Sequence, residues 1–207
     1  MKKIFPAVFV VLCFGFNHAQ AQNWDIDLLK KINPDNPSSD YWKGVSNSTY
    51  YVAIGIPVVE TAIGYIEGNK NLKRNGWETI VTIAGSAIIT EGIKLAANRT
   101  RPYNAYPDLI HAYSTRDYGY SMPSGHTSLA FATATSLALQ YKKWYIVAPA
   151  YIWASSVGYS RLYLGEHYPS DVFVGAVIGA GSAVVTHWLA KKINPQKKTK
   201  PTSVVLK

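Results

Sequence analysis

Five long apolar segments dominate this sequence and restrict what the chain can fold into. Each is rich in Ala, Gly, Ile and Val, and each is close to the length at which an α-helix crosses a bilayer. The pattern predicts an all-α fold in which five helices cross a membrane. The segments are residues 50–66, 77–97, 126–140, 144–159 and 172–190.

Polar residues and loop charges bear on whether these segments lie in a membrane. A soluble helical bundle is an open alternative, because the segments contain Glu60, Glu78, Glu91 and Pro149. The loops favour the membrane, since five crossings that start outside put every strongly basic connection inside, as the positive-inside rule requires. These inner stretches are residues 67–76, Lys142–Lys143 and the chain from Lys191 onward.

The first 21 residues have the three regions of a secretory signal peptide. Two lysines are followed by the apolar run 4–16 and by Ala19-Gln20-Ala21, which predicts cleavage after Ala21. An uncleaved anchor is the alternative. The only cysteine, Cys13, lies in this stretch, so the mature chain would contain none. This suits export to an oxidising compartment and excludes disulfides, thiolate catalysis and cysteine-bound metals.

The rest of the chain is expected to form one domain, residues 22–193, followed by a basic and disordered tail, residues 194–207. Residues 23–33 predict an amphipathic helix ahead of the apolar ones. The 207 residues include 21 Lys and Arg against 12 Asp and Glu, a net charge of +9. Because the excess lies in the predicted inner loops and tail, it indicates a membrane surface, and no nucleic acid partner is expected of an exported protein.

The connection at residues 160–171 carries an arginine, a histidine and a carboxylate between two apolar segments. Pro169 predicts that the next helix begins there, which puts His167 just before a helix N-terminus. Asp171 can accept a proton from one imidazole nitrogen and leave the other as a lone pair, as in a histidine nucleophile or base. Arg161 and the helix N-terminus favour an anion at the same place. The alternative is that the histidine and aspartate only cap the helix.

Two further helix ends carry groups suited to an anion. The proline after Arg101 predicts that the second apolar helix stops at this arginine, with Lys94 two turns earlier on the same side. At the start of the third helix, Ser124 is the expected N-cap and Gly125 lets the backbone approach a ligand, so the free amides can cradle an oxyanion. His126 follows at the mouth.

Three motifs therefore occur in order, each at a helix end and all on the outer side of the predicted topology. With every defining position of these motifs present, the chain resembles the type 2 phosphatidic acid phosphatase (PAP2) superfamily, which includes lipid phosphate phosphatases, bacterial class A acid phosphatases and vanadium haloperoxidases. The resemblance covers residues 94–171 closely. Its motifs are Lys94-x6-Arg101-Pro102, Pro123-Ser124-Gly125-His126 and Ser160-Arg161-x5-His167-x3-Asp171.

The resemblance implies a six-helix bundle and hydrolysis through a phosphohistidine, with no metal and no cofactor. Carried over by residue, His167 is the nucleophile, Asp171 is its orienting partner, and His126 is the general acid that later activates water. The same comparison implies that the phosphoryl oxygens are held by Lys94, Arg101, Ser124, Gly125 and Arg161.

Two features lie outside this resemblance. Glu166 neighbours the expected nucleophile but occupies no motif position, so no role is assigned to it. Residues 103–122 form a long, tyrosine-rich connection between the first two motifs. It is expected to be either a lid that contacts substrate or a surface loop, and its length favours the lid.

The expected function is a phosphatase that acts on a membrane lipid phosphate or diphosphate, in the bacterial inner membrane, with the active site facing the periplasm. Candidate substrates are undecaprenyl diphosphate, phosphatidylglycerol phosphate, phosphatidate and lipid A phosphate. One alternative is a soluble periplasmic acid phosphatase of broad specificity. Others are a vanadium-dependent haloperoxidase and a non-catalytic membrane protein that keeps the anion site.

Overall fold

A computed structural model describes residues 18–114 and 119–193, with the backbone alone described for residues 18–23. All regular structure in these ranges is helical, and six long helices accompany the single turn α4, which confirms the expected all-α, six-helix fold. The helices are α1 (His18–Ile32), α2 (Asp40–Ile66), α3 (Lys70–Ala97), α4 (Pro102–Ala105), α5 (Gly125–Tyr141), α6 (Trp144–Tyr163) and α7 (Pro169–Ile193).

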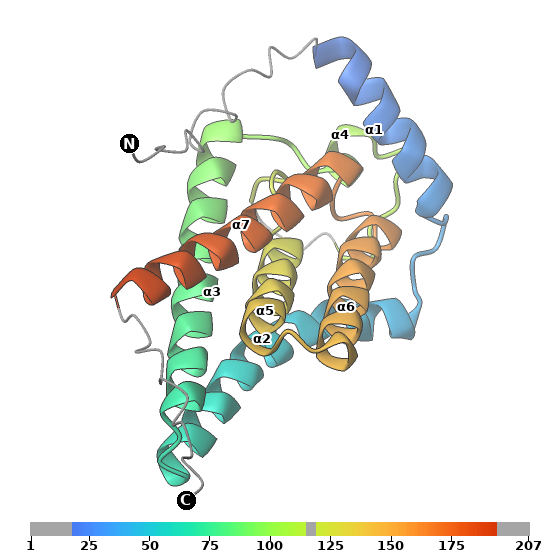
Figure 1. Cartoon of the computed structure of the whole chain (residues 1–207). Helices are drawn as coiled ribbons and strands as arrows, with labels where there is room; N and C mark the ends of the chain where they lie inside the picture. The colour runs from blue at the N-terminus through green and yellow to red at the C-terminus, as the bar shows by residue number, and fades with distance from the viewer. Residues whose placement is uncertain (1–17, 115–118, 194–207) are drawn as a thin grey trace, which may run out of the picture.

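Helix α5 is the centre of the bundle and packs against α2, α3, α6 and α7 (Figure 1). Glycines allow the closest of these contacts. A Cβ atom at Gly179 of α7 would lie 2.1 Å from the carbonyl oxygen of Ser128, and one at Gly175 would lie 2.6 Å from that of Ser124. Small residues spaced four apart let helix backbones approach in this way in membrane proteins.

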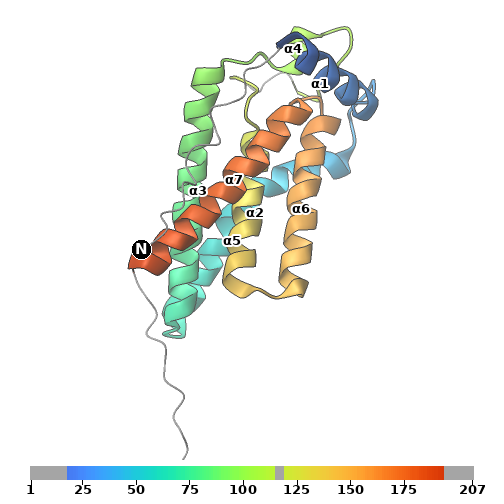
Figure 2. The same cartoon turned by 45° about the horizontal axis from the view of Figure 1, so that its top comes forward.

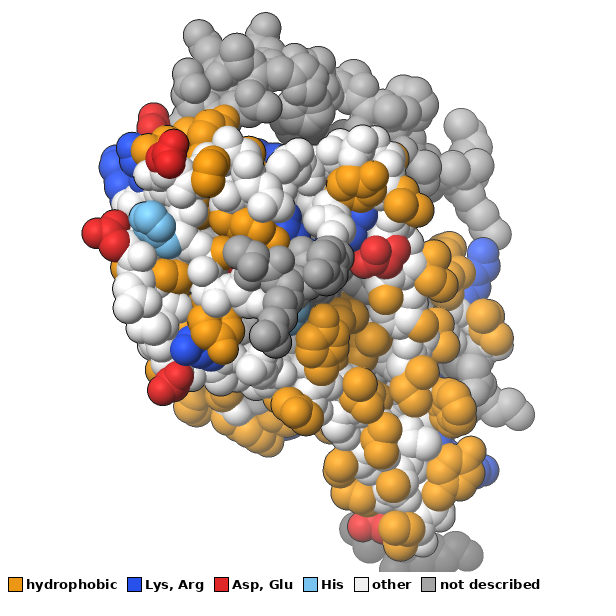
Figure 3. Space-filling view, turned by 180° about the vertical axis from the view of Figure 1, so that it is seen from behind, with side chains coloured by type: hydrophobic (Ala, Val, Ile, Leu, Met, Phe, Trp, Pro, Cys, Tyr) orange, Lys and Arg blue, Asp and Glu red, His pale blue; other side chains and the backbone are white. Residues whose placement is uncertain are grey.

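Helices α2, α3 and α7 are long and apolar enough to cross a membrane. Large hydrophobic side chains stand exposed along them, and Figure 3 shows such side chains gathered over the narrow lower part of the molecule, formed by α2 and α3. The chain is therefore a membrane protein. The crossings by α5 and α6 stay predictions, because these helices of 17 and 20 residues do not reach the same combination of length and hydropathy.

Two acidic residues inside the apolar helices face the interior of the bundle. The Tyr141 hydroxyl donates to Glu60 at 2.6 Å, and His187 Nδ1 lies 2.5 Å from Glu78. Ionisable residues in membrane helices usually face a bundle interior and pair with one another. Their presence in the sequence is therefore compatible with membrane-crossing helices.

Helix α1 lies across one end of the bundle, next to α4, in both ribbon views (Figure 1, Figure 2). Ile26 and Leu29 on α1 pack in a hydrophobic cluster with Tyr103, Ile110 and further buried side chains of the long connection and of the α6–α7 region. Tyr103 and Ile110 thus anchor the connection at 103–122 to the core, while residues 107–109 between them are exposed. Residues 115–118 lie outside the described residues, so the lid role stays a prediction.

The predicted helix boundaries are right at two sites and wrong at one. Helix α7 begins at Pro169, and Ser124 caps α5 through its side chain. Helix α3, in contrast, ends at Ala97 and not at Arg101. Asn98 adopts a left-handed conformation with φ of 46°, which stops the helix, and Arg101 is the N-cap of α4. Lys94 and Arg101 therefore do not share one side of a helix.

The predicted terminal segments are largely beyond the part of the chain that the structure describes. Helix α1 begins at His18, inside the expected signal peptide, residues 1–21, most of which lies outside the described residues. The basic tail, residues 194–207, lies outside them entirely. Cleavage after Ala21 and a disordered tail stay predictions.

Candidate active site

The three sequence motifs meet at one end of the bundle. Helices α3 and α6 end there, α5 and α7 begin there, and α1 and α4 cover it (Figure 1, Figure 2). The backbone N–H of Ser124 donates to the Asp171 carbonyl at 3.0 Å, and that of Ser121 donates to the Arg99 carbonyl at 2.7 Å. Residues far apart in the chain are thus joined at the level of the backbone.

His167 lies just before α7 and Asp171 lies in the first turn of this helix, and both are buried. The distance from His167 Nδ1 to Asp171 Oδ2 is 3.6 Å, which is an ion-pair contact but longer than a hydrogen bond. Such contacts often tighten only when substrate binds. The arrangement orients Nδ1 toward the carboxylate and leaves Nε2 for a ligand.

Burial lowers the pKa of His167 to about 4. The carboxylate of Asp171 opposes this shift, and the positive charge of Arg161 adds to it. At neutral pH the imidazole is therefore uncharged and keeps a lone pair, which both a nucleophile and a base require.

The carboxylate of Asp171 is held by three hydrogen-bond donors. Arg99 donates to Oδ1 at 2.7 Å, while the Ser121 hydroxyl at 2.5 Å and the backbone N–H of Tyr168 at 2.9 Å donate to Oδ2. Three donors restrict the carboxylate to one orientation and favour its charged form.

Arg99 was not among the predicted site residues. Its second terminal nitrogen donates to Asp25 of α1 at 2.7 Å, and its guanidinium lies over the Tyr168 ring, 3.7 Å from the centroid. Asp25 also accepts from the Ser170 backbone N–H at 2.9 Å. Arg99 thus links α1 to the carboxylate of Asp171. Apart from its position between Lys94 and Arg101, no local pattern indicates this role.

The three expected phosphate-binding cations lie at the same end of the bundle. Lys94 Nζ donates to the Tyr120 carbonyl at 2.9 Å. Arg101 donates through Nε to the Gly119 carbonyl at 3.2 Å, and Arg161 donates to the Ser46 hydroxyl at 2.7 Å. Both arginines are buried, so their charged guanidinium groups lie in the protein interior and not in solvent.

Glu166, to which the sequence assigned no role, is buried between these arginines. Its Oε2 lies 3.1 Å from Arg101 and 3.7 Å from Arg161. No sequence pattern around Glu166 indicates that it forms ion pairs with arginines. Only the tertiary structure reveals these contacts.

The start of α5 completes the group. The Ser124 side chain accepts from the Thr127 backbone N–H and hydroxyl, as expected of an N-cap. A Cβ atom at Gly125 would meet only a Thr90 methyl at 4.0 Å, so the protein itself leaves room there. The His126 ring packs edge-on against Tyr50. Burial lowers the pKa of His126 to about 2, and the positive charge of Arg161 adds to this shift, so the imidazole is uncharged at neutral pH when no anion is bound.

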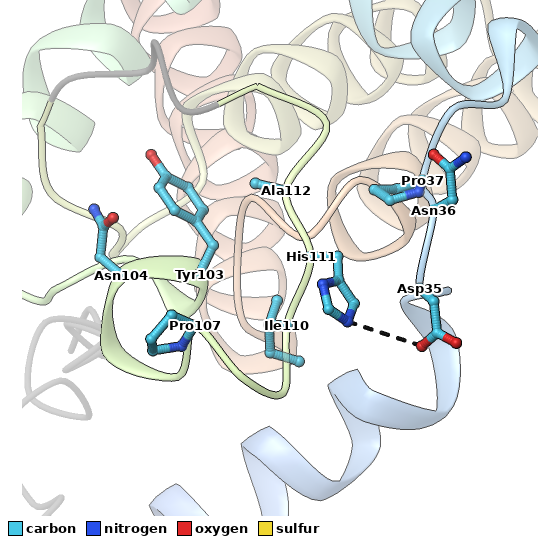
Figure 4. Close-up of a pocket in the computed structure, with 9 residues that line it drawn as sticks. All are labelled: Asp35, Asn36, Pro37, Tyr103, Asn104, Pro107, Ile110, His111 and Ala112. Carbon is cyan, nitrogen blue, oxygen red and sulfur yellow. Dashed lines mark ion pairs between the residues drawn. The ribbon is translucent and has the colours of Figure 1, made fainter.

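A separate hollow lies beside this site and contains none of the predicted site residues (Figure 4). It lies between the α1–α2 connection and residues 103–112, with His111 Nε2 at 3.8 Å from Asp35. Within the described ranges, no three His, Cys, Asp or Glu side chains are grouped as a metal ion would need.

Comparison with known proteins places residues 75–195 in the PAP2 superfamily. Lipid A 4'-phosphatase of Bacteroides thetaiotaomicron is 33% identical over 95 residues, 45% of this chain and 42% of the relative. Phosphatidylglycerophosphatase B of Escherichia coli is 32% identical over 90 residues, 42% of this chain and 35% of the relative. The matches thus span less than half the length of these curated relatives.

Two solved structures share the fold. The crystal structure of Aquifex aeolicus LpxE superimposes with a TM-score of 0.64 at 25% identity, over 80% of this chain and 95% of that one. A transmembrane PAP2-type phosphatidylglycerolphosphate phosphatase from Bacillus subtilis gives a TM-score of 0.68 at 19% identity, over 87% and 91%.

Proposed function

Because the chain belongs to the PAP2 superfamily, we propose that it is a metal-independent phosphatase that hydrolyses a phosphate monoester or diphosphate of a membrane lipid. One observation carries the proposal: two histidines, three cations and a helix N-terminus converge at one end of a bundle of apolar helices. A tetrahedral oxyanion needs several donors and positive charges, and these side chains supply them without a metal ion.

The first proposed step transfers the phosphoryl group to the enzyme. Nε2 of neutral His167 attacks phosphorus, and the bond from phosphorus to the lipid oxygen breaks. His126 must be protonated for this step, and the negative charge of the bound phosphate opposes the low pKa that burial and the nearby cations give its imidazole. His126 then gives the lipid oxygen its proton. Positive charge develops on the imidazole of His167, and Asp171 stabilises it through Nδ1. The oxyanion is held by Lys94, Arg101, Arg161, the Ser124 side chain and the amide of Gly125.

The second step regenerates the enzyme. His126, now neutral, takes a proton from water, and the resulting hydroxide attacks phosphorus as the bond to His167 breaks. Inorganic phosphate leaves, and His167 returns to the uncharged form that its burial favours.

A lipid substrate is favoured by the surroundings of the site and by the relatives. The site lies at the end of helices that are long and apolar enough to lie in a bilayer, where a lipid head group would be presented. The curated relatives described above are named for lipid A and phosphatidylglycerophosphate, which share a phosphorylated head on a lipid anchor. These relatives do not favour the acid phosphatase and haloperoxidase alternatives.

We place the site on the periplasmic side of a bacterial inner membrane. Helix α3 runs from Lys70 to the site, and α7 runs from the site to Ile193, so basic residues of the predicted inner loops lie at the far end of the bundle. Positive residues favour the cytoplasmic side of a membrane. The signal peptide expected at residues 1–21 agrees with an outer location for α1.

Phosphate release by detergent-purified, full-length protein tests this function. A panel should hold lipid A, phosphatidylglycerophosphate, phosphatidate, undecaprenyl diphosphate and a water-soluble aryl phosphate. We expect turnover of at least one lipid in the presence of a chelator, and none by His167→Asn. Preference for the soluble ester, together with extraction without detergent, would favour the periplasmic acid phosphatase instead.

A further inference from the structure

The proposed nucleophile and its carboxylate are close together but do not form a hydrogen bond. His167 Nδ1 is buried, and no acceptor among the described residues lies within hydrogen-bond distance of it. Oδ2 of Asp171, the carboxylate oxygen that Nδ1 faces, is 3.6 Å away. A neutral imidazole that attacks through Nε2 carries its hydrogen on Nδ1, so this buried donor has no acceptor. Such a group costs free energy and needs an explanation.

The other hydrogen bonds of Oδ2 explain the long distance. A carboxylate oxygen has about two lone-pair sites. Oδ2 of Asp171 already accepts two hydrogen bonds, from the Ser121 hydroxyl at 2.5 Å and from the backbone N–H of Tyr168 at 2.9 Å. Arg99 occupies the other oxygen, Oδ1, at 2.7 Å. In the resting enzyme, therefore, the oxygen that faces His167 has no lone pair left for Nδ1–H.

Only one of the two donors to Oδ2 is free to turn away. The Tyr168 N–H belongs to the backbone just before α7, and the carbonyl of the same residue accepts from Val172 at 3.2 Å, so the helix sets its position. The Ser121 backbone is fixed as well, because its N–H donates to the Arg99 carbonyl at 2.7 Å. The hydroxyl of Ser121, in contrast, rotates about a single bond. Ser121 is therefore the donor that can release Oδ2.

We propose that Ser121 is a positioning residue, whose hydroxyl occupies Oδ2 of Asp171 in the resting enzyme and gives it up to Nδ1–H of His167 when that imidazole becomes charged. The inference rests on the proposed function. The exchange transfers no proton, since each donor keeps its own hydrogen. A strong hydrogen bond to Asp171 thus forms only as positive charge develops, which stabilises the transition state more than the ground state. As phosphorus leaves His167 in the second step, the serine bonds to Oδ2 again and helps the imidazole to return to its uncharged form.

The pKa of His167 tests this exchange directly, because it is measured without turnover. The probe is the titration of NMR signals from isotopically labelled histidine in full-length, detergent-purified protein, with the His167 signals assigned by their loss in His167→Asn. Ser121→Ala frees a lone pair on Oδ2, so Nδ1–H gains a hydrogen bond that favours the charged imidazole. The pKa of His167 should rise from about 4 by about one pH unit, and the acid limb of kcat/KM should rise with it.

The direction of this shift separates the exchange from simple structural support. If the Ser121 hydroxyl only held the carboxylate in place, its loss would lower the pKa of His167 or leave it unchanged. A stronger bond to Asp171 also makes the imidazole a poorer leaving group, so the phosphoenzyme should be hydrolysed about three- to tenfold more slowly and should accumulate in trapping experiments. The other charged or titratable groups that act on this pair through space stay unchanged in the variant, and they include Lys94, Arg99, Arg101, His126 and Arg161.

Two further replacements of the serine grade the effect and keep the test usable if Ser121→Ala fails to fold. Ser121→Cys keeps the size but donates weakly, so the pKa of His167 should lie between those of wild type and Ser121→Ala. Ser121→Thr keeps the hydroxyl and should restore both the pKa and the rate of phosphoenzyme hydrolysis. Ser170→Ala is the matched control, because it removes a hydroxyl that accepts from Arg99 at 2.7 Å and donates to Asp25. It should leave the pKa of His167 near that of wild type.

The inference is wrong if the pKa of His167 is unchanged or lowered in Ser121→Ala or in Ser121→Cys. An equal rise in Ser170→Ala, or faster hydrolysis of the phosphoenzyme in Ser121→Ala, would also overturn it. A wild-type protein that releases phosphate from no substrate would refute the proposed phosphatase function instead. The histidine titration would still decide in that case whether Ser121 competes with His167 for Oδ2.

Discussion

Arg99→Lys tests whether the contact of Arg99 with Asp171 positions this carboxylate for catalysis. Arg99 reaches Asp171 and Asp25 through two different terminal nitrogens, each at 2.7 Å. A lysine has a single nitrogen on a flexible stem and cannot reproduce this fork. The substitution keeps the charge, so its effect isolates geometry.

The expected cost follows from the bonds that are lost. A hydrogen bond to a charged group contributes about 1.5–3 kcal/mol. A fifth of the Arg99 side chain is exposed. Water screens such a pair, so we take the lower part of that range, about 1.5–2 kcal/mol. If the loss falls on the transition state, where charge develops on His167, kcat decreases about 10- to 30-fold with little change in KM.

The assay is steady-state phosphate release from the best lipid substrate, together with trapping of the phosphoenzyme. Asp25→Asn is the matched control, because it breaks the link to α1 but keeps the contact of Arg99 with Asp171. It should lower Tm and leave kcat within about threefold of wild type. A folded Arg99→Lys protein with wild-type kcat would refute the positioning role, as would an Asp25→Asn protein that is equally slow.

Other predictions concern the nucleophile, the oxyanion pocket, helix packing and topology. Burial lowers the pKa of His167 to about 4, so protonation removes its lone pair only below that pH. The acid limb of the pH profile of kcat/KM should therefore lie near 4, and a limb at 6.5 would contradict the role of burial. Vanadate should inhibit competitively, and Arg161→Ala should lose both inhibition and turnover; full activity would exclude the arginine from the pocket. Gly179→Leu should lower the free energy of unfolding by about 1–3 kcal/mol, because even its Cβ would overlap the Ser128 carbonyl oxygen. Gly181→Leu is the control and should keep a Tm near that of wild type, because nothing lies within 4 Å of a Cβ atom there. Reporter fusions that work only in the periplasm should be active after Gly165 and inactive after Lys70, whereas activity at both would point to a soluble periplasmic protein.

Local rules were sufficient for the features that depend on neighbouring residues. The start of α7 at Pro169, the cap at Ser124 and the four-residue spacing of His167 and Asp171 all depend on contacts within four residues. The long apolar segments likewise determined the number and order of the helices, since helical hydrogen bonds and bilayer length are properties of a single segment.

The end of α3 shows where local reasoning reached its limit. The proline after Arg101 forbids helix there, but the chain leaves the helix earlier, at Asn98 in a left-handed conformation. That exit is compatible with the positions that Arg99 and Arg101 take beside α1 and Glu166. A local signal sets the latest residue at which a helix can end, and tertiary contacts select the actual one.

The sequence by itself thus determined the long helices and the motif residues, but not the residue at which α3 ends. Only the tertiary structure decided which charges meet. Arg99 and Asp25 are 74 residues apart, Ser121 and Asp171 are 50 apart, and Arg161 and Ser46 are 115 apart. No periodicity encodes such pairs, because an ion pair between distant residues depends on how whole helices pack and on how much water their packing removes.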